Sequence, residues 1–246
     1  MKRILIVYLL LLPFITFGQK KIDTNKLYKL LADKLAPLDL SGVLKSESAV
    51  IVGFIGSNYQ RIQIHYSSIV KDKSKPDEYL VKGKSKVKDN VCDFTGVITI
   101  TKTIENEQYT GDTGKAAMYV NLDSVREGTL TAHYNFKEDS TQKFSGIFDG
   151  TLTSDFYLDI NYKPHYDNTM QGADDYSNNQ FTGTWIMYGG KLIKKCNWGD
   201  YRIPDCGNLD VGVGNFTPDQ KYIKNGWQNY CTGCPDDSNK TKNWWQ

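Results

Sequence analysis

Five cysteines carry the most definite chemistry in this 246-residue chain. Two of them, Cys231 and Cys234, form a CxxC motif, a spacing that occurs in redox pairs and in zinc sites. The motif lies in a polar, coil-like stretch without a strand-to-helix context, so we favour structural disulfides over redox or zinc chemistry. The four cysteines that follow residue 195 are expected to pair with one another, and they are Cys196, Cys206, Cys231 and Cys234. Their connectivity stays open, and Cys92 is left as a buried thiol.

Three histidines are the candidates for metal binding or general-base catalysis: His65, His133 and His165. The first two fall on the polar faces of predicted strands, and no HxH or HxxxH spacing brings two of them together. We therefore expect surface or hydrogen-bonded histidines, with no metal and no other cofactor.

Acidic residues offer a second route to catalysis, because paired carboxylates on barrel strands leave no local motif. The candidates are Asp149, Asp155 and Asp159, of which the first and last are predicted to point outward. The stretch 167–179 holds oxygen ligands for Ca²⁺ but lacks EF-hand spacing, so a solvated loop is favoured. Because motifs such as GxSxG, HExxH and GxGxxG are also missing, a non-catalytic protein is favoured, with a hydrolase that uses dispersed carboxylates as an alternative.

Four lysines alternate with small or apolar residues in the stretch 82–88, and they are Lys82, Lys84, Lys86 and Lys88. In a strand their ammonium groups lie on one face. Such a row is typical of a solvent-facing strand, or of an edge strand that lysines guard against edge-to-edge pairing. The alternative is a docking strip for an acidic protein partner or an anionic glycan, with an affinity that falls steeply with salt.

Strands must position most of these residues, because the dominant period from about residue 40 to 196 is two. In the stretch 129–136, for example, apolar residues alternate with threonine, histidine and asparagine. Short turn-rich breaks such as Gly189-Gly190 connect the segments as hairpins. This pattern predicts an antiparallel meander.

A pattern of phenylalanine, one polar residue, glycine and further large residues recurs from Phe94, Phe144 and Phe181. Each glycine is expected on the apolar face, where it leaves room for the strand to coil or for a neighbour to approach. Barrels need such corners, so we expect all-β architecture, with about eight to ten strands that close into one barrel. In this pattern the sequence resembles lipocalin-like and avidin-like barrels.

The N-terminal region has the features of a secretory signal peptide, with Lys2 and Arg3 before an apolar run and Gly18 as the small residue at the cleavage site. We expect a secreted or periplasmic protein without membrane insertion after cleavage. A helix over 24–36 is predicted from its N-cap, its leucine face and the proline that follows it. The expected divisions are a signal peptide (1–18), an N-terminal helix (19–38), a β-barrel domain (39–195) and a cysteine-rich irregular tail packed on the barrel (196–246).

The charge balance argues against nucleic acid as a partner. The chain has 30 Lys and Arg against 28 Asp and Glu, and the leader holds the two extra positive charges. Our leading hypothesis is an exported, non-catalytic binding protein with a small apolar ligand inside the barrel. The residues expected to line that site are Tyr134, Phe148 and Trp185. The alternative is a protein-binding module of the inhibitor or immunity type, which uses surface loops and the lysine row.

Overall fold

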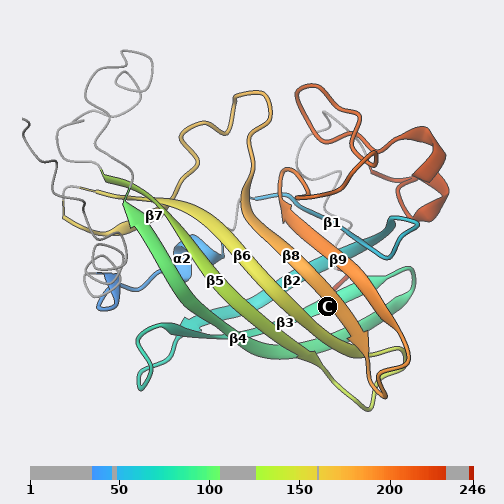
Figure 1. Ribbon diagram of the computed structural model, residues 1–246, viewed down its shortest axis with the longest axis horizontal. Coiled ribbons are helices and arrows are strands. Elements are labelled where there is room, and N and C mark those ends of the chain that lie inside the picture. Colours follow the sequence, from blue (N-terminus) through green and yellow to red (C-terminus); the bar gives the residue numbers. More distant parts are fainter. Residues whose placement is uncertain (1–34, 46–48, 106–125, 160, 231–243) are drawn as a thin grey trace, which may run out of the picture.

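The chain folds around one antiparallel sheet of nine strands, as seen in a computed structural model that describes residues 35–45, 49–105, 126–159, 161–230 and 244–246 (Figure 1). The strands are β1 (Ile51–Ile55), β2 (Gln60–Lys71), β3 (Glu78–Val87), β4 (Asn90–Glu105), β5 (Arg126–Glu138), β6 (Gly146–Leu158), β7 (Pro164–Tyr166), β8 (Asn178–Met187) and β9 (Ile193–Asp200). Their order is β5-β4-β3-β2-β1-β9-β8-β6-β7, and β5 also pairs with β6. This last pairing closes eight strands into a barrel, and β7 only extends the edge of β6. The predicted all-β antiparallel barrel is confirmed.

The helices of the described residues are short. They are α2 (Ser41–Leu44) and the 3-10 helix η2 (Gln220–Asn225). None of the described helices is long and apolar enough to cross a membrane. The predicted leader and nearly all of the predicted helix over 24–36 lie outside the described residues.

Glycines let neighbouring strands approach closely on the inner wall, as the recurring Phe-x-Gly pattern predicted. Gly150 of β6 lies opposite Gly183 of β8, and the side chain of Tyr134 covers both. A Cβ atom would lie 2.8 Å from the Tyr134 hydroxyl oxygen at Gly150, and 2.5 Å from it at Gly183. Both distances are too short for carbon and oxygen, so larger residues would push the aromatic ring or the strands apart. An aromatic ring over a strand glycine is a known device for strong sheet curvature.

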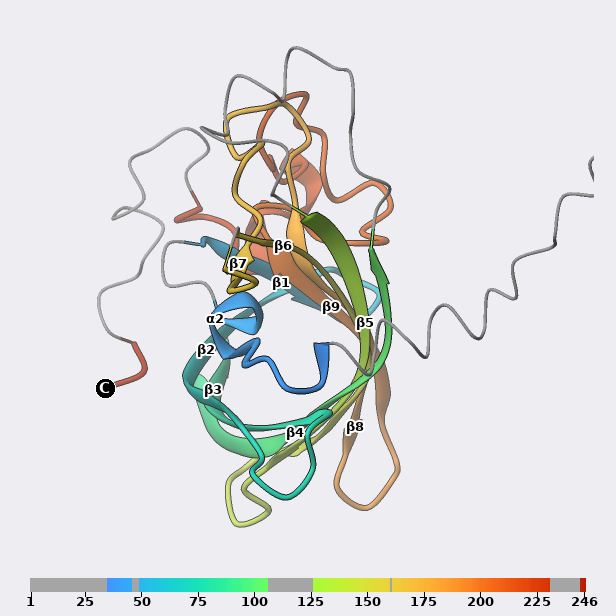
Figure 2. The same cartoon turned by 90° about the vertical axis from the view of Figure 1, so that its left-hand side faces the viewer.

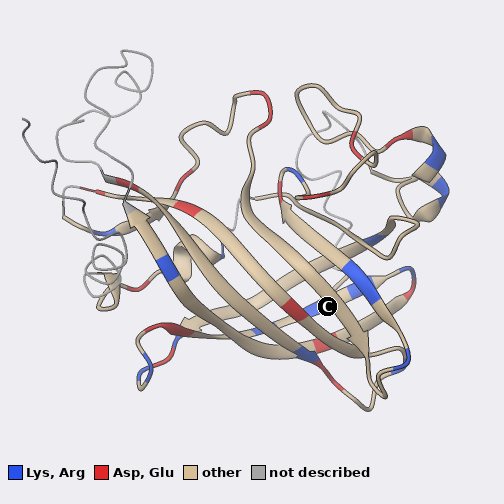
Figure 3. Cartoon of the chain, in the orientation of Figure 1, with Lys and Arg blue, Asp and Glu red and all other residues tan. Residues whose placement is uncertain are grey.

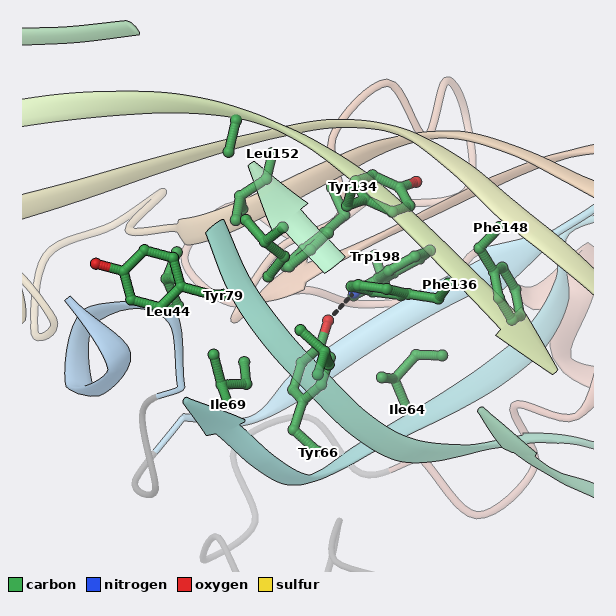
Figure 4. Packing of buried hydrophobic residues seen from close by; sticks show 14 of the residues in the cluster. Leu44, Ile64, Tyr66, Ile69, Tyr79, Tyr134, Phe136, Phe148, Leu152 and Trp198 are labelled. Carbon is green, nitrogen blue, oxygen red and sulfur yellow. Dashed lines mark hydrogen bonds between the residues drawn. The ribbon is translucent and has the colours of Figure 1, made fainter. Parts of the chain in front are cut away.

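Aromatic side chains fill the middle of the barrel (Figure 4). The rings of Phe181 and Trp198 stack with their centroids 4.8 Å apart, and those of Phe94 and Phe136 at 5.2 Å. Trp198 Nε1 donates a hydrogen bond of 3.0 Å to the hydroxyl of Tyr66, which satisfies a polar atom that the core would otherwise leave unpaired. Burial of each such ring contributes roughly 2–3 kcal/mol to stability, so this region is a packed core.

One end of the barrel is closed by the segment around α2, which Figure 2 shows lying across the opening of the ring of strands. Val43 and Leu44 of α2 are buried in the barrel core. Asn179 Nδ2 ties the helix to the wall, since it donates to the Val43 carbonyl at 3.1 Å and to Asp200 Oδ2 at 2.9 Å. The hydroxyl of Tyr166 donates to the same carboxylate oxygen at 3.0 Å. Burial raises the pKa of Asp200 to about 7.

The described part of the C-terminal segment packs on the outside of the barrel. It forms a second hydrophobic core with Val52 and Phe54, which point outward from β1. The guanidinium of Arg61 lies 5.6 Å from the ring centroid of Trp227 and 5.3 Å from that of Tyr230. Cation–π contacts of this kind fix the segment to β2.

Candidate functional site

The end of the barrel away from α2 is open, and a pocket of about 410 Å³ lies there. Four hairpin connections meet at this end, those between β1 and β2, β3 and β4, β5 and β6, and β8 and β9. Each contributes a lining residue, and these are Asn58, Asp89, Phe144 and Leu192. Lysines and acidic residues lie on these hairpins, whereas long stretches of the strands carry neither (Figure 3). The size of the pocket is that of small-molecule sites.

Glu138, the last residue of β5, is a buried charged group of this pocket and is only 4% exposed. Its Oε1 accepts a hydrogen bond from the Ser85 hydroxyl. Its Oε2 accepts one from Gly146 N at 2.8 Å and one from Trp185 Nε1 at 2.9 Å. Burial raises the pKa of Glu138, and these three hydrogen bonds oppose the rise. The carboxyl group is therefore held in one orientation in a poorly hydrated place.

Two polar side chains at the base of the pocket, those of Glu138 and Ser85, belong to the inward-facing rows of their strands. Glu138 follows Tyr134 and Phe136 at a period of two, and Ser85 follows Val81 and Gly83 in the same way. The sequence patterns missed both residues. The alternation of residues 129–136 was followed only to Phe136; continued for two more residues at the same period, it places Glu138 on the inner face.

Phe148 and Trp185, two of the predicted ligand contacts, line the pocket. They lie opposite each other in the pairing of β6 with β8. The ammonium of Lys194 lies 6.0 Å from the centroid of the Trp185 ring, at the distance of a cation–π contact. The third predicted contact, Tyr134, lies deeper, among the fully buried core aromatics, and is not part of the pocket lining.

Phe144 places an exposed aromatic ring at the mouth of the pocket. It is 73% exposed, and its backbone has a φ of 54°. A bulky residue in this left-handed region is strained, and such strain clusters at functional sites. Two residues further along the chain, Gly146 makes room for the side chain of Trp185. A Cβ at this position would lie 2.7 Å from Cε2 of Trp185, so only glycine allows the indole to reach Glu138.

The lysine row is shorter than predicted. Lys88 lies in the β3–β4 turn, with a φ of 54°, and lines the pocket instead of the outer wall. The remaining members alternate with buried residues of β3 and face outward; they are Lys82, Lys84 and Lys86. β3 pairs with both β2 and β4, so of the two settings expected for the row, a solvent-facing strand or an edge strand, the edge strand is wrong. Lys84 Nζ lies 2.8 Å from a carboxylate oxygen of Asp93, which neutralises part of the row.

The outer wall of β2 and β3 also carries two tryptophans near the C-terminus. The ring of Trp245 stacks on His65 with the centroids 4.2 Å apart, and the Lys86 ammonium lies 6.0 Å from the centroid of Trp244. Burial and the nearby charges of Lys45 and Lys84 lower the pKa of His65. The chain itself thus covers part of the surface that the lysine row would offer to a partner.

The other histidines and the candidate acids lie away from the pocket lining. His133 Nε2 lies 3.3 Å from Asp149 Oδ2, and both side chains are about half exposed on the outer wall. His165 Nε2 lies 2.9 Å from Asp159 Oδ2 beside the short β7. Asp155 accepts a hydrogen bond from a threonine of β5. None of these residues lines the pocket, so they do not form a catalytic pair within it.

The acidic residues of the loop before β8 are engaged separately. Asp167 accepts hydrogen bonds from the backbone and hydroxyl of Thr169, and Asp175 forms an ion pair of 2.8 Å with Arg202. Among the residues that the structure describes, no three histidines, cysteines or acids cluster as metal ligands would. Both carboxylates are thus engaged with groups of the protein itself.

Cys92, Cys196 and Cys206 are free thiols in the structure. Cys92 is buried, as predicted. Cys196 belongs to the inner row of β9 and is fully buried in the barrel core, so its sulfur faces away from the tail with which it was expected to pair. Burial raises the pKa of both Cys196 and Cys206. The other two cysteines of the expected disulfides, Cys231 and Cys234, lie outside the described residues.

Comparison with protein-family models, with curated proteins and with solved structures finds no match for this chain. The site is therefore interpreted from its own geometry. What that geometry offers is a closed antiparallel β-barrel of a kind suited to binding, with a pocket at one end.

Proposed function

We propose that this chain is an exported, non-catalytic binding protein that holds a small, largely apolar ligand in the open end of its barrel. The pocket carries the proposal: about 410 Å³ of space, walls that include Phe148 and Trp185, and three buried polar residues, Gln60, Ser85 and Glu138. Apolar walls with a few fixed polar groups are the usual composition of a ligand site. Export is supported by the features of the first eighteen residues.

The position of the pocket sharpens the original hypothesis of a ligand inside the barrel. Aromatic rings fill the middle of the barrel, and the segment around α2 lies across the far end. A ligand therefore enters between the hairpins and stops at Glu138 and Phe148. The exposed ring of Phe144 stands at this entrance, where it can fold over a bound molecule.

A catalytic role has less support from the geometry. The His133–Asp149 pair lies on the outer wall with both side chains about half exposed, and hydrolysis needs a substrate held beside its acid and base. A role for the lysine row in binding an acidic protein is weakened by the ion pair of Lys84 and by the tryptophans that cover part of the wall.

A fluorescent probe tests the proposal directly. N-phenylnaphthylamine is neutral at pH 7 and brightens in apolar surroundings, and we expect it to bind the protein with one site. Val87→Trp places an indole in the pocket, since Val87 is a partly buried lining residue. The matched control is Thr95→Trp, an equally large change at an exposed position on the outer face of β4.

The expected result is loss of probe binding in V87W and retention in T95W, with both variants melting cooperatively. Equal binding by the wild type and V87W would place the probe elsewhere and contradict the proposal. Absence of binding by the wild type, for this probe and for compounds extracted with the native protein, would contradict it as well.

A further inference from the structure

The carboxyl group of Glu138 narrows the chemistry of the ligand, an argument that rests on the proposed function. Glu138 is 4% exposed, and no lysine, arginine or histidine among the described residues forms an ion pair with it. Removing a carboxylate from water without a cation destabilises a fold. This barrel nevertheless keeps one at the base of its pocket.

The hydrogen-bond pattern at the base leaves room for a donor and for nothing else. Ser85, Gly146 and Trp185 each direct a hydrogen at Glu138, so none of these hydrogens is left for a ligand. Oε1 accepts one hydrogen bond and Oε2 accepts two, whereas a carboxylate has about four lone-pair positions. Glu138 therefore has about one acceptor position left for a ligand, and its three donors have no hydrogen to offer one.

The aromatic walls are also suited to a positive charge. The Trp185 ring already has the ammonium of Lys194 at 6.0 Å from its centroid, and because Lys194 also lines the pocket, a ligand cation would share this ring with it. Phe148 supplies a second ring in the same lining. A ligand ammonium next to Glu138 would gain a charge-assisted hydrogen bond and a contact with aromatic faces.

The charges at the mouth do not reverse this preference. Lys88 and Asp89 are adjacent in the β3–β4 turn, carry opposite charges and are exposed to water. Exposed charges are screened by salt, while a buried carboxylate is screened much less. Lys194 is the remaining charged residue of the lining; it is only partly buried, whereas Glu138 is 4% exposed, so the charge of Glu138 is the less screened of the two and favours a cationic ligand.

We infer that the ligand is an organic amine: a protonated ammonium group bound to the Glu138 carboxylate, on an apolar body that packs against Phe148 and Trp185. Its outer end lies at the mouth between Lys88 and Phe144, where a neutral or acidic group is accepted.

Three compounds with one ring system test the inference: naphthylmethylamine, methylnaphthalene and naphthoate, which are cationic, neutral and anionic at pH 7. Calorimetric titration of the wild-type protein should give the amine about ten-fold or more higher affinity than the hydrocarbon, and the acid the lowest affinity. This comparison needs no variant. In E138Q the amide oxygen keeps the bonds from Gly146 and Trp185, and the amide nitrogen faces Ser85, whose hydroxyl then accepts; the charge and the spare acceptor position are lost together.

The amine should lose its advantage in E138Q, to within about two-fold of methylnaphthalene, while methylnaphthalene binding is unchanged. The control D149N removes a half-exposed carboxylate of the outer wall, away from the pocket lining, and should leave the preference intact. Failure of all three compounds to bind would contradict the proposed function. Binding of methylnaphthalene with no preference for the amine in the wild type, or a preference that survives E138Q or is lost in D149N, would overturn the inference alone.

Discussion

The carboxyl group of Asp200 should make the protein less stable as the pH rises from about 4 to about 7. Asp200 ends β9 at the closed end of the barrel and is 4% exposed. Its partners among the described residues are the neutral groups of Tyr166 and Asn179, so the carboxyl group gains two hydrogen bonds but no cation. Burial raises its pKa from 3.8 to about 7 in the folded protein.

The sign follows from the protons bound in each state. Between pH 4 and pH 7 the unfolded chain has lost the proton of Asp200 while the folded protein still holds it, so rising pH favours unfolding. One pKa unit corresponds to about 1.4 kcal/mol, and the shift of roughly three units amounts to about 4 kcal/mol. The contribution of Asp200 to the free energy of unfolding is complete below pH 4, decreases progressively up to pH 7, and changes little above pH 7.

The variant Asp200→Asn isolates this contribution, because asparagine resembles the protonated acid and keeps an oxygen for Tyr166 and Asn179. Urea unfolding of the wild type and of D200N should be measured every half pH unit from 4 to 8. The difference in unfolding free energy between the two proteins should grow by about 4 kcal/mol in favour of D200N over this range. A constant difference would refute the reasoning, since every other titrating group is common to both proteins.

Three further predictions concern the packing of the barrel. Gly183→Ala should destabilise the protein by about 1–3 kcal/mol in urea unfolding, because no space exists for the new methyl group, whereas Gly172→Ala, with open space around it, should change stability by less than about 0.5 kcal/mol. Cys196 should resist an alkylating reagent in the native protein and react after unfolding, as read by peptide mass spectrometry; alkylation under native conditions would contradict its burial in the core. Arg61→Ala should weaken the docking of the C-terminal segment by about 1–2 kcal/mol through the lost contact with Trp227, and limited proteolysis should then cleave that segment faster than in the wild type.

The barrel was predictable because its signals are local. Alternation such as that of residues 129–136 fixes which side chains face inward, and the glycine of each Phe-x-Gly pattern marks a close approach of strands. Turn-rich breaks such as that of Gly189 and Gly190, both with positive φ, connect neighbouring antiparallel strands, here β8 and β9 across residues 188–192. The β5–β6 pairing, which completes the ring in the strand order given above, is a local hairpin, and the pairing of β1 with β9 joins the first and last strands of the chain once the sheet curves.

The candidate site was less predictable because it depends on where strands end and on contacts distant in sequence. Glu138 and Ser85 are 53 residues apart, and only the pairing of strands brings them together. Tyr134 and Phe148 both carry inward rings, but alternation with a period of two residues does not show which ring lies in the packed middle of the barrel and which at its open end. The expectation for Cys196 failed for a similar reason, since the tail boundary at residue 196 cut through β9 and hid its inward position.

Glu138 and Asp200 are both buried acids, and their surroundings predict different consequences of removing the charge. Asp200 faces a closed network at the plugged end, whereas Glu138 faces an open pocket and keeps an unused acceptor position. A buried charge that is retained for a ligand lowers the stability of the ligand-free protein, because the carboxylate has lost its hydration and has no cation beside it. Burial raises the pKa of Glu138, so its ionised form is disfavoured in the folded state without ligand.

Glu138→Gln should therefore increase the unfolding free energy of the ligand-free protein at pH 7, by an amount on the order of 1 kcal/mol, while it reduces affinity for the amine. Thermal and urea unfolding of the wild type and E138Q, each with and without naphthylmethylamine, measure both effects in one series. The amine should stabilise both proteins by mass action, but E138Q less, by about 1.4 kcal/mol for each ten-fold loss of affinity when the amine is in excess. If E138Q instead proves less stable than the wild type by more than about 1 kcal/mol, the charged form of Glu138 is needed by the fold itself, and its presence says nothing about a ligand.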